Sequence, residues 1–245
     1  MDSNFNIIHK TTVSSTNDDA KKKLQTEITP NFTVISATEQ LIGKGLRKNS
    51  WHSQSGKNLT ISIITYPKFL KVTEQFYLSK MISLGILEYL KTKGKYFKIK
   101  WPNDIYINDK KVCGILIESS IAGSTIKNSV IGIGLNINQT DFPKNLPSAT
   151  SLALITGKVY QLDTELNILL TNIYEFYNDL KKLNFSRIDN LYHTNLYKIN
   201  KLNQFKDSTG TFFGTITGTT SDGKLIINTA NNQIKTYNFK EIEFI

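Results

Sequence analysis

KWPNDIYINDKKVCGILIE, residues 100–118, predicts a β-hairpin. The first strand is the β-prone run 105–107, and Asn108-Asp109 provide residues that tolerate a tight turn. The second run, 112–117, is almost entirely apolar, which is too hydrophobic for a strand on the protein surface. The hairpin is therefore expected to lie in the core.

Five polar side chains accompany this apolar hairpin: Lys100, Asn103, Asp104, Lys111 and Glu118. An unpaired charge is costly to bury, so charges this close to a core are expected to be ion-paired or to serve a site. From spacing alone two interpretations remain open: a hairpin with solvated ends, and an active site built around the hairpin.

The same residues carry a family resemblance. Lys100-Trp-Pro-Asn-Asp104, followed by Lys111-x-x-Gly-Ile-Leu-x-Glu118, resembles the signature of biotin protein ligases. The resemblance implies an enzyme that uses ATP and Mg²⁺ to activate biotin as biotinoyl-5′-AMP. It also implies transfer of the biotinoyl group to a lysine of a biotin carboxyl carrier protein, such as that of acetyl-CoA carboxylase.

The resemblance implies an α+β fold with a class II synthetase-like mixed sheet flanked by helices over residues 1–196. A small SH3-like C-terminal β-barrel is implied over 197–245. The residue patterns agree, because helical apolar periodicity gives way to short β-prone segments near this boundary. Outside the hairpin, strands are expected at 7–12, 33–37, 59–66, 126–138, 212–219, 225–228 and 234–239, and helices at 18–24, 72–90, 148–155, 163–183 and 185–193.

Composition limits the possible classes of protein. The net charge is +10, but the lysines are scattered, so no DNA partner is expected. The catalytic block is expected to begin at about residue 5, so the N-terminal DNA-binding domain of repressor-type ligases is not expected. No run reaches the roughly 18 apolar residues of a membrane helix, and no signal peptide is visible. A cytoplasmic protein without a membrane partner is expected. Cys113 lies in the apolar hairpin run and is expected to be a core residue.

Ser15, Thr16 and Asn17 precede an acidic first turn at Asp18-Asp19. Hydroxyl and amide side chains at this place are typical of helix N-caps. The resemblance implies a second role, because family residues at this position lie near the ureido group of biotin. Both roles remain open.

Residues 39–58 contain three glycines and four cationic residues but no helical or strand period, which is typical of a functional loop. The segment resembles the family loop that closes over biotin and the adenylate, with Gln40, Gly43, Gly45 and Trp51 at matching positions. Lys44 replaces the first loop arginine and Leu46 the second. Arg47 is a candidate to take over one phosphate contact.

Gly132 to Asn136 end a predicted strand with two glycines. A glycine in a strand marks either a bulge or a close approach of the backbone to another group. The resemblance places this segment in the ligand cleft and implies that Asn136 binds the adenine side of the nucleotide.

The expected site residues fall into four groups. Catalytic roles are expected for Lys111, Lys100, Asp104 and Arg47. Biotin contacts are expected for Ser15, Thr16, Asn17, Gln40, Gly43, Lys44, Lys111, Gly114 and Ile115. Contacts with ATP or the adenylate are expected for Lys44, Arg47, Trp51, Asn103, Lys111, Gly132 and Asn136. Mg²⁺ is expected at Asn103 and Asp104, directly or through water, although Asp104 also suits a role as base toward the incoming lysine.

Two rival functions remain. A lipoate or octanoate ligase or transferase on the same fold would have an open, apolar pocket without partners for a urea group. A non-catalytic binding protein would leave Lys111 and the basic loop as solvated charges, and it would not release pyrophosphate from ATP.

Overall fold

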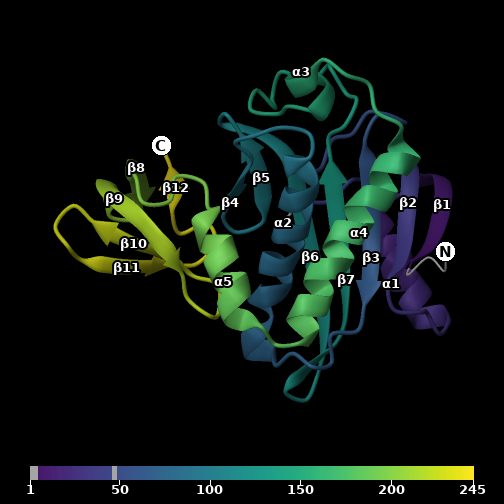
Figure 1. The fold of residues 1–245 in the computed structure, drawn as a ribbon, viewed down its shortest axis with the longest axis horizontal. Coiled ribbons are helices and arrows are strands. Elements are labelled where there is room, and N and C mark those ends of the chain that lie inside the picture. The colour runs from purple at the N-terminus through teal and green to yellow at the C-terminus, as the bar shows by residue number, and fades with distance from the viewer. Residues whose placement is uncertain (1–4, 46–48) are drawn as a thin grey trace.

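The computed structural model describes residues 5–45 and 49–245. The larger sheet consists of β1 (Asn6–Val13), β2 (Thr33–Gln40), β3 (Leu59–Thr65), β4 (Lys98–Lys100), β5 (Asp104–Ile107), β6 (Lys110–Ala122) and β7 (Thr125–Leu135). The strand order is β1-β2-β3-β7-β6-β5-β4 (Figure 1). Only the β1–β2 pair is parallel, so the predicted mixed sheet is confirmed.

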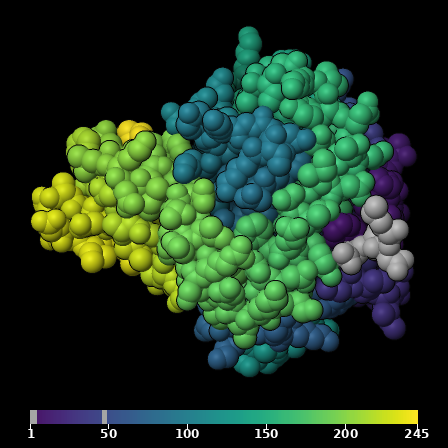
Figure 2. Space-filling model, in the orientation of Figure 1, coloured from purple at the N-terminus to yellow at the C-terminus, as the bar shows by residue number. Residues whose placement is uncertain are grey.

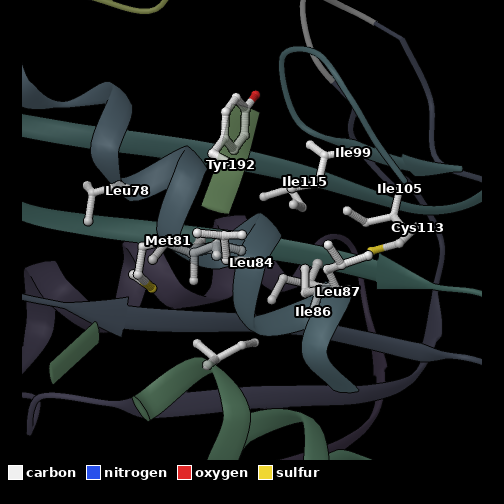
Figure 3. Packing of buried hydrophobic residues seen from close by; sticks show 14 of the residues in the cluster. Leu78, Met81, Leu84, Ile86, Leu87, Ile99, Ile105, Cys113, Ile115 and Tyr192 are labelled. Atoms are coloured by element: carbon white, nitrogen blue, oxygen red, sulfur yellow. The ribbon is translucent and has the colours of Figure 1, made fainter. Parts of the chain in front are cut away.

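Helices lie on both faces of this sheet. α2 (Phe76–Lys91) and α4 (Leu162–Lys181) pack together over one face, and α1 (Thr16–Thr26) packs on the other, against β2, β3 and β7 (Figure 1). The main core lies beneath α2, where Met81, Leu84 and Leu87 belong to one buried cluster with the hairpin residues Ile105 and Ile115 (Figure 3). The opposite face, beside α1, is therefore the one with room for a site.

The central hairpin forms as its sequence predicts. β5 and β6 are antiparallel, and the turn residues Asn108 and Asp109 have φ values of 47° and 62°. These left-handed conformations suit a two-residue hairpin turn, and Asn and Asp tolerate them better than most residues. Cys113 is 0 % exposed, which confirms it as a core residue.

Several predicted elements begin or end elsewhere; the second hairpin strand, for example, runs on to Ala122 instead of ending at residue 117. The helix expected at 72–90 starts with a separate 3-10 turn, η2 (Val72–Glu74), before α2. The helix expected at 148–155 is only α3 (Leu152–Thr156), because 148–150 instead pair with β6 beside Lys111. The strand expected at 126–138 ends at Leu135. Backbone pairing with distant segments, which no local pattern encodes, decides these boundaries.

After α5 (Phe185–Thr194) the chain forms a second, five-stranded antiparallel sheet. Its strands are β8 (Leu202–Asp207), β9 (Gly210–Thr219), β10 (Leu225–Thr229), β11 (Ile234–Tyr237) and β12 (Glu243–Phe244), in the order β11-β10-β9-β8-β12. The sheet forms a lobe at the left of Figure 2. The strands at β4, β8 and β12 were not predicted. Within the described ranges, no helix is both long and apolar enough to cross a membrane.

The C-terminal sheet is fixed to the hairpin side of the larger sheet. The Trp101 indole Nε1 donates a buried hydrogen bond of 2.8 Å to the carbonyl of Gly223, in the turn between β9 and β10. The Trp101 ring also contacts Phe239 with a centroid separation of 6.1 Å. The segment that leads into β5 is therefore held by the C-terminal sheet.

Candidate active site

A cavity of about 360 Å³ lies on the α1 face of the larger sheet. Along β7, Ile131 and Ile133 pack in the core, while Gly132 and Gly134 face the opposite side. Successive side chains of a strand point to opposite faces, so the glycines leave the cavity floor open. Of the predicted site residues, the cavity brings together Ser15, Thr16, Asn17, Gln40, Lys44, Trp51, Lys100, Asn103, Asp104, Lys111, Gly114, Ile115 and Gly132.

Buried polar side chains form a network at the α1 end of the cavity. Gln40 Oε1 accepts hydrogen bonds from the backbone N–H (2.8 Å) and the hydroxyl (3.0 Å) of Thr16. Asn17 Nδ2 donates to Glu118 (2.8 Å), and Asn17 Oδ1 lies 2.6 Å from the Ser62 hydroxyl. The network holds these amide and hydroxyl groups in fixed orientations, as a satisfied buried network does.

Ser15 occupies the N-cap position of α1, but its side chain makes no capping hydrogen bond. The residue is only 2 % exposed and lines the cavity. Helix capping therefore does not account for its hydroxyl, although the predicted acidic first turn at Asp18 and Asp19 is present.

The Trp51 ring lies close against the glycines of the floor. A Cβ added at Gly134 would come within 2.2 Å of the indole ring, and one added at Gly114 would come within 3.0 Å. The indole Nε1 is buried and has no hydrogen-bond partner among the described residues. Buried donors are normally satisfied, so this N–H suits an acceptor atom on a ligand.

The charged centre of the cavity belongs to the hairpin. Lys111 Nζ lies 2.8 Å from an Asp104 carboxylate oxygen, and both side chains are about a third exposed. Asn103 Nδ2 donates to the carbonyl of Ile115, which holds the start of β5 against β6. The Ile115 side chain points into the core beneath α2 (Figure 3), so only its backbone side borders the cavity.

A second cavity of about 230 Å³ adjoins the first, and Trp51 and Lys111 line both. Asn136 lies in its wall, where its Nδ2 donates to the carbonyl of Thr150 at 2.9 Å. Its Oδ1 is buried without a partner among the described residues. Asn136 therefore contributes to the wall of the second cavity an amide whose oxygen is unpaired among the described residues.

Three predicted residues differ from their expected roles. Gly43 lines neither cavity. A Cβ there would meet the Trp51 carbonyl at 2.3 Å, so the glycine accommodates the loop's own backbone. Lys44 lines the cavity, but its Nζ is ion-paired with Asp18 at 2.6 Å. Arg47 lies outside the described residues.

Sequence reasoning missed the contribution of the C-terminal sheet. Phe239, Lys240, Ile242, Glu243 and Phe244 line the first cavity, more than a hundred residues after the hairpin. The β-prone pattern predicted a strand up to residue 239, but no local signal indicates which surface the end of the chain would meet.

Lys100 lies at this C-terminal end of the cavity. Burial lowers the pKa of its ammonium group, and the neighbouring cations Lys198 and Lys111 lower it further, while Asp104 and Asp109 oppose the shift. A perturbed lysine in a cleft is a candidate for a functional role.

These features agree with a comparison of the sequence with known proteins. Residues 10–136, just over half of the chain, match the Biotin/lipoate A/B protein ligase family. The chain belongs to this family. The resemblance inferred from the hairpin signature is thereby confirmed.

The ligase is similar to both characterised proteins and solved structures. It is 31 % identical over 236 residues to the bifunctional ligase/repressor BirA of Bacillus spizizenii, covering 94 % of this chain and 72 % of that protein. It is 26 % identical over 199 residues to the biotin–[acetyl-CoA-carboxylase] ligase of Paracoccus denitrificans, covering 79 % and 82 %. The Aquifex aeolicus biotin protein ligase in complex with biotin and ATP superposes with a TM-score of 0.81, 26 % identity and 98 % coverage of both chains.

The ligase offers few protein ligands for a metal ion. In residues 5–45 and 49–245, no group of three or more His, Cys, Asp or Glu side chains could hold one. Asn103 and Asp104 both line the cavity, but Asp104 is ion-paired with Lys111. Mg²⁺ usually binds one or two carboxylates together with substrate phosphates, so this pair fits Mg²⁺ only as a partner of ATP.

Proposed function

We propose that the ligase activates biotin with ATP and attaches the biotinoyl group to a lysine of a biotin carboxyl carrier protein in the cytoplasm. One observation carries the proposal: two adjoining cavities, one with a buried polar network and one with an unsatisfied Asn136 oxygen, share Lys111. That arrangement suits a ligand with a polar head, a central negative charge and a base.

Biotin occupies the first cavity with its ureido group toward α1. A neutral urea needs both donors and acceptors, and the amides of Asn17 and Gln40 with the hydroxyls of Ser15 and Thr16 offer both. The carboxylate end of biotin then points toward Lys111. This polar end argues against the lipoate-type rival, whose acyl chain has no urea for these groups to bind.

The adenine ring occupies the second cavity. An amino group of the base donates to Asn136 Oδ1, which satisfies the buried acceptor. Trp51 borders both cavities and offers a flat aromatic surface to the nucleotide. Gly132 and Gly134 leave room on the floor for the Asn17 amide and the Trp51 indole, which border the ligand.

In the first step a biotin carboxylate oxygen attacks the α-phosphorus of ATP, and the bond to the β-phosphate oxygen breaks to release pyrophosphate. The reaction brings an anion onto a polyanion, so fixed cations that act on the developing charge lower its barrier. Lys111 is central because it lies where the two cavities meet, and Lys100, Lys44 and Arg47 add positive charge. Mg²⁺ bound with ATP near Asn103 and Asp104 would neutralise further phosphate charge.

In the second step the amine of a carrier lysine attacks the acyl carbon, and the bond to AMP breaks. The incoming ammonium must first lose a proton, and Asp104 is the carboxylate nearest to Lys111. Asp104 thus has two candidate roles, as a ligand of Mg²⁺ and as the base. In this proposal residues 1–196 form the catalytic domain, and residues 197–245 form a small β-domain whose C-terminal end adds Phe239, Lys240 and Glu243 to the wall of the first cavity.

The direct test is incorporation of radiolabelled biotin into a purified biotin carboxyl carrier domain in the presence of ATP and Mg²⁺. We expect labelling that requires ATP and is accompanied by pyrophosphate release. A folded protein that releases no pyrophosphate with biotin but does so with octanoate would establish the lipoate-type rival instead. Absence of pyrophosphate release with either acid would indicate a binding protein.

Lys44→Arg is expected to slow the release of biotinoyl-AMP into solution by about fivefold, because arginine offers a bidentate contact to phosphate where lysine offers a point charge. Release can be followed as free adenylate after mixing enzyme, biotin and ATP without carrier. Lys57→Arg, at an exposed lysine of the same loop, is the matched control. A release rate unchanged by Lys44→Arg would contradict the prediction.

A further inference from the structure

Three aromatic rings surround the Lys100 ammonium at the C-terminal end of the cavity. Its Nζ lies 4.4 Å from the ring centroid of Tyr106, 5.2 Å from that of Phe244 and 5.9 Å from that of Tyr197. All three distances fall within the range in which a cation is attracted to the face of a ring. We call these three residues the aromatic cage.

The aromatic cage is assembled from three separate parts of the chain. Tyr106 belongs to β5, Tyr197 follows α5, and Phe244 belongs to β12 of the C-terminal sheet. The Tyr197 ring lies 5.7 Å from Tyr106 and 6.3 Å from Phe244, so the rings form a continuous row. The Tyr197 hydroxyl donates to Asp109 at the hairpin turn, which fixes the middle ring.

Phe244 is held in place by its own sheet. It pairs with Phe205 in the β12–β8 ladder, and the two rings lie 5.4 Å apart. Residue 205 is fully buried, so this contact anchors the end of the chain to the core of the C-terminal sheet. The same short strand thus contributes one cavity wall and one ring of the cage.

We propose that Tyr106, Tyr197 and Phe244 are positioning residues of the ligase, which hold the Lys100 ammonium at the cavity wall for the phosphates of ATP. A lysine side chain has four rotatable bonds, so without a cage its ammonium would sample many positions outside the cavity. The inference rests on the proposed function, because it assigns Lys100 to the ATP-dependent step. It makes the C-terminal sheet part of the active site.

The charges that face Lys100 come from every element around it. Asp104 and Asp109 favour its charged form, and Lys111 and Lys198 disfavour it. Lys240 and Glu243, of opposite charge, line the same cavity from the C-terminal segment. Burial has the largest effect and lowers the pKa of Lys100, and the contacts of its ammonium with the three rings offset part of the cost of this burial.

Phe244→Leu tests this role, because leucine keeps the apolar burial but removes the ring that attracts the cation. We expect the pKa of Lys100 to fall further. As the pH is raised, pyrophosphate release with biotin and ATP should therefore begin to decline at a lower pH than in the wild type. At neutral pH the KM for ATP should rise roughly fivefold, in line with one lost cation–π contact. The affinity for biotin alone should not change, because the biotin contacts lie at the α1 end.

Two further variants complete the design. Phe244→Tyr retains an aromatic face and should restore the wild-type pH profile. Phe213→Leu removes a phenylalanine that is 53 % exposed on the same C-terminal sheet, and it should leave the profile unchanged. A Phe244→Leu enzyme with the wild-type pH profile and KM for ATP would overturn the proposal.

A titration of the Lys100 side-chain nitrogen by NMR separates this inference from the proposed function. If Phe244→Leu lowers the pKa of Lys100 in the unliganded protein, the cage holds the ammonium whatever reaction follows. An unchanged pKa would exclude the cage even in an active ligase. A wild type that releases no pyrophosphate with biotin would overturn the proposed function while the titration still decides whether the cage holds Lys100.

Discussion

Lys111→Ala is expected to lower the rate of biotinoyl-adenylate formation by on the order of a hundredfold or more. Lys111 lies where the two cavities meet, and its Nζ is held 2.8 Å from Asp104 and 5.6 Å from the Trp51 ring centroid. A fixed donor aimed at charge that develops in the transition state typically contributes about 3 kcal/mol. The rate is measured as pyrophosphate release from ATP with biotin and without carrier protein.

Lys110→Ala is the matched control, because Lys110 is the adjacent lysine of β6 and is exposed. Adjacent strand residues point to opposite faces, so its loss should leave adenylate formation at the wild-type rate. Lys111→Arg should recover part of the activity, since it keeps the charge but changes the reach of the donor. If Lys111→Ala forms the adenylate at the wild-type rate, the role assigned to Lys111 is wrong, although the protein can still be a ligase that labels its carrier.

Gly132→Ala is expected to weaken the binding of biotin alone by roughly tenfold to a hundredfold. A Cβ at this position would lie 2.3 Å from Asn17 Oδ1, so the amide must move. That amide is tied to Glu118 and Ser62, and displacing it disturbs the network proposed to bind the ureido group. Forcing an extra methyl group into a packed site typically costs about 1–3 kcal/mol. Isothermal titration with biotin gives the affinity directly.

Gly94→Ala is the control for this prediction. The nearest atom to a Cβ there is on the Phe97 ring at 3.5 Å, an ordinary contact, so biotin affinity should stay at the wild-type value. Thermal unfolding of both variants shows whether each still folds. If folded Gly132→Ala binds biotin as the wild type does, the α1 end of the cavity is not where biotin binds.

The hairpin is the part of the structure that local sequence patterns predict best. The β-prone run 105–107 and the apolar run 112–117, with Asn108 and Asp109 at the turn, predicted both strands, and the positive φ values of the turn residues agree. Local patterns succeed here because turn chemistry and strand propensity act between residues that are neighbours in the chain. The family signature in the same stretch also indicated where the charged centre of the cavity would be.

Other site residues required contacts between distant segments. The polar network joins Asn17 to Glu118, which are 101 positions apart, and the Trp101 indole meets the Gly223 carbonyl 122 positions later. The pattern around Ile115 correctly indicated a buried strand but not which face would meet the ligand. The structure turns that side chain toward α2 and leaves Gly114 against Trp51.

The sequence alone determined the family, the mixed sheet with its central hairpin, and thirteen of the residues that line the first cavity. These features can be recognised from short motifs and from the pattern of apolar residues along single strands, which are local properties of the chain. Only the tertiary structure decided that Phe244 and Tyr197 surround Lys100, that Gly43 serves the loop backbone, and that two cavities meet at Lys111. These features depend on how two sheets and a loop pack against one another, and packing between distant segments leaves no periodic trace in the sequence.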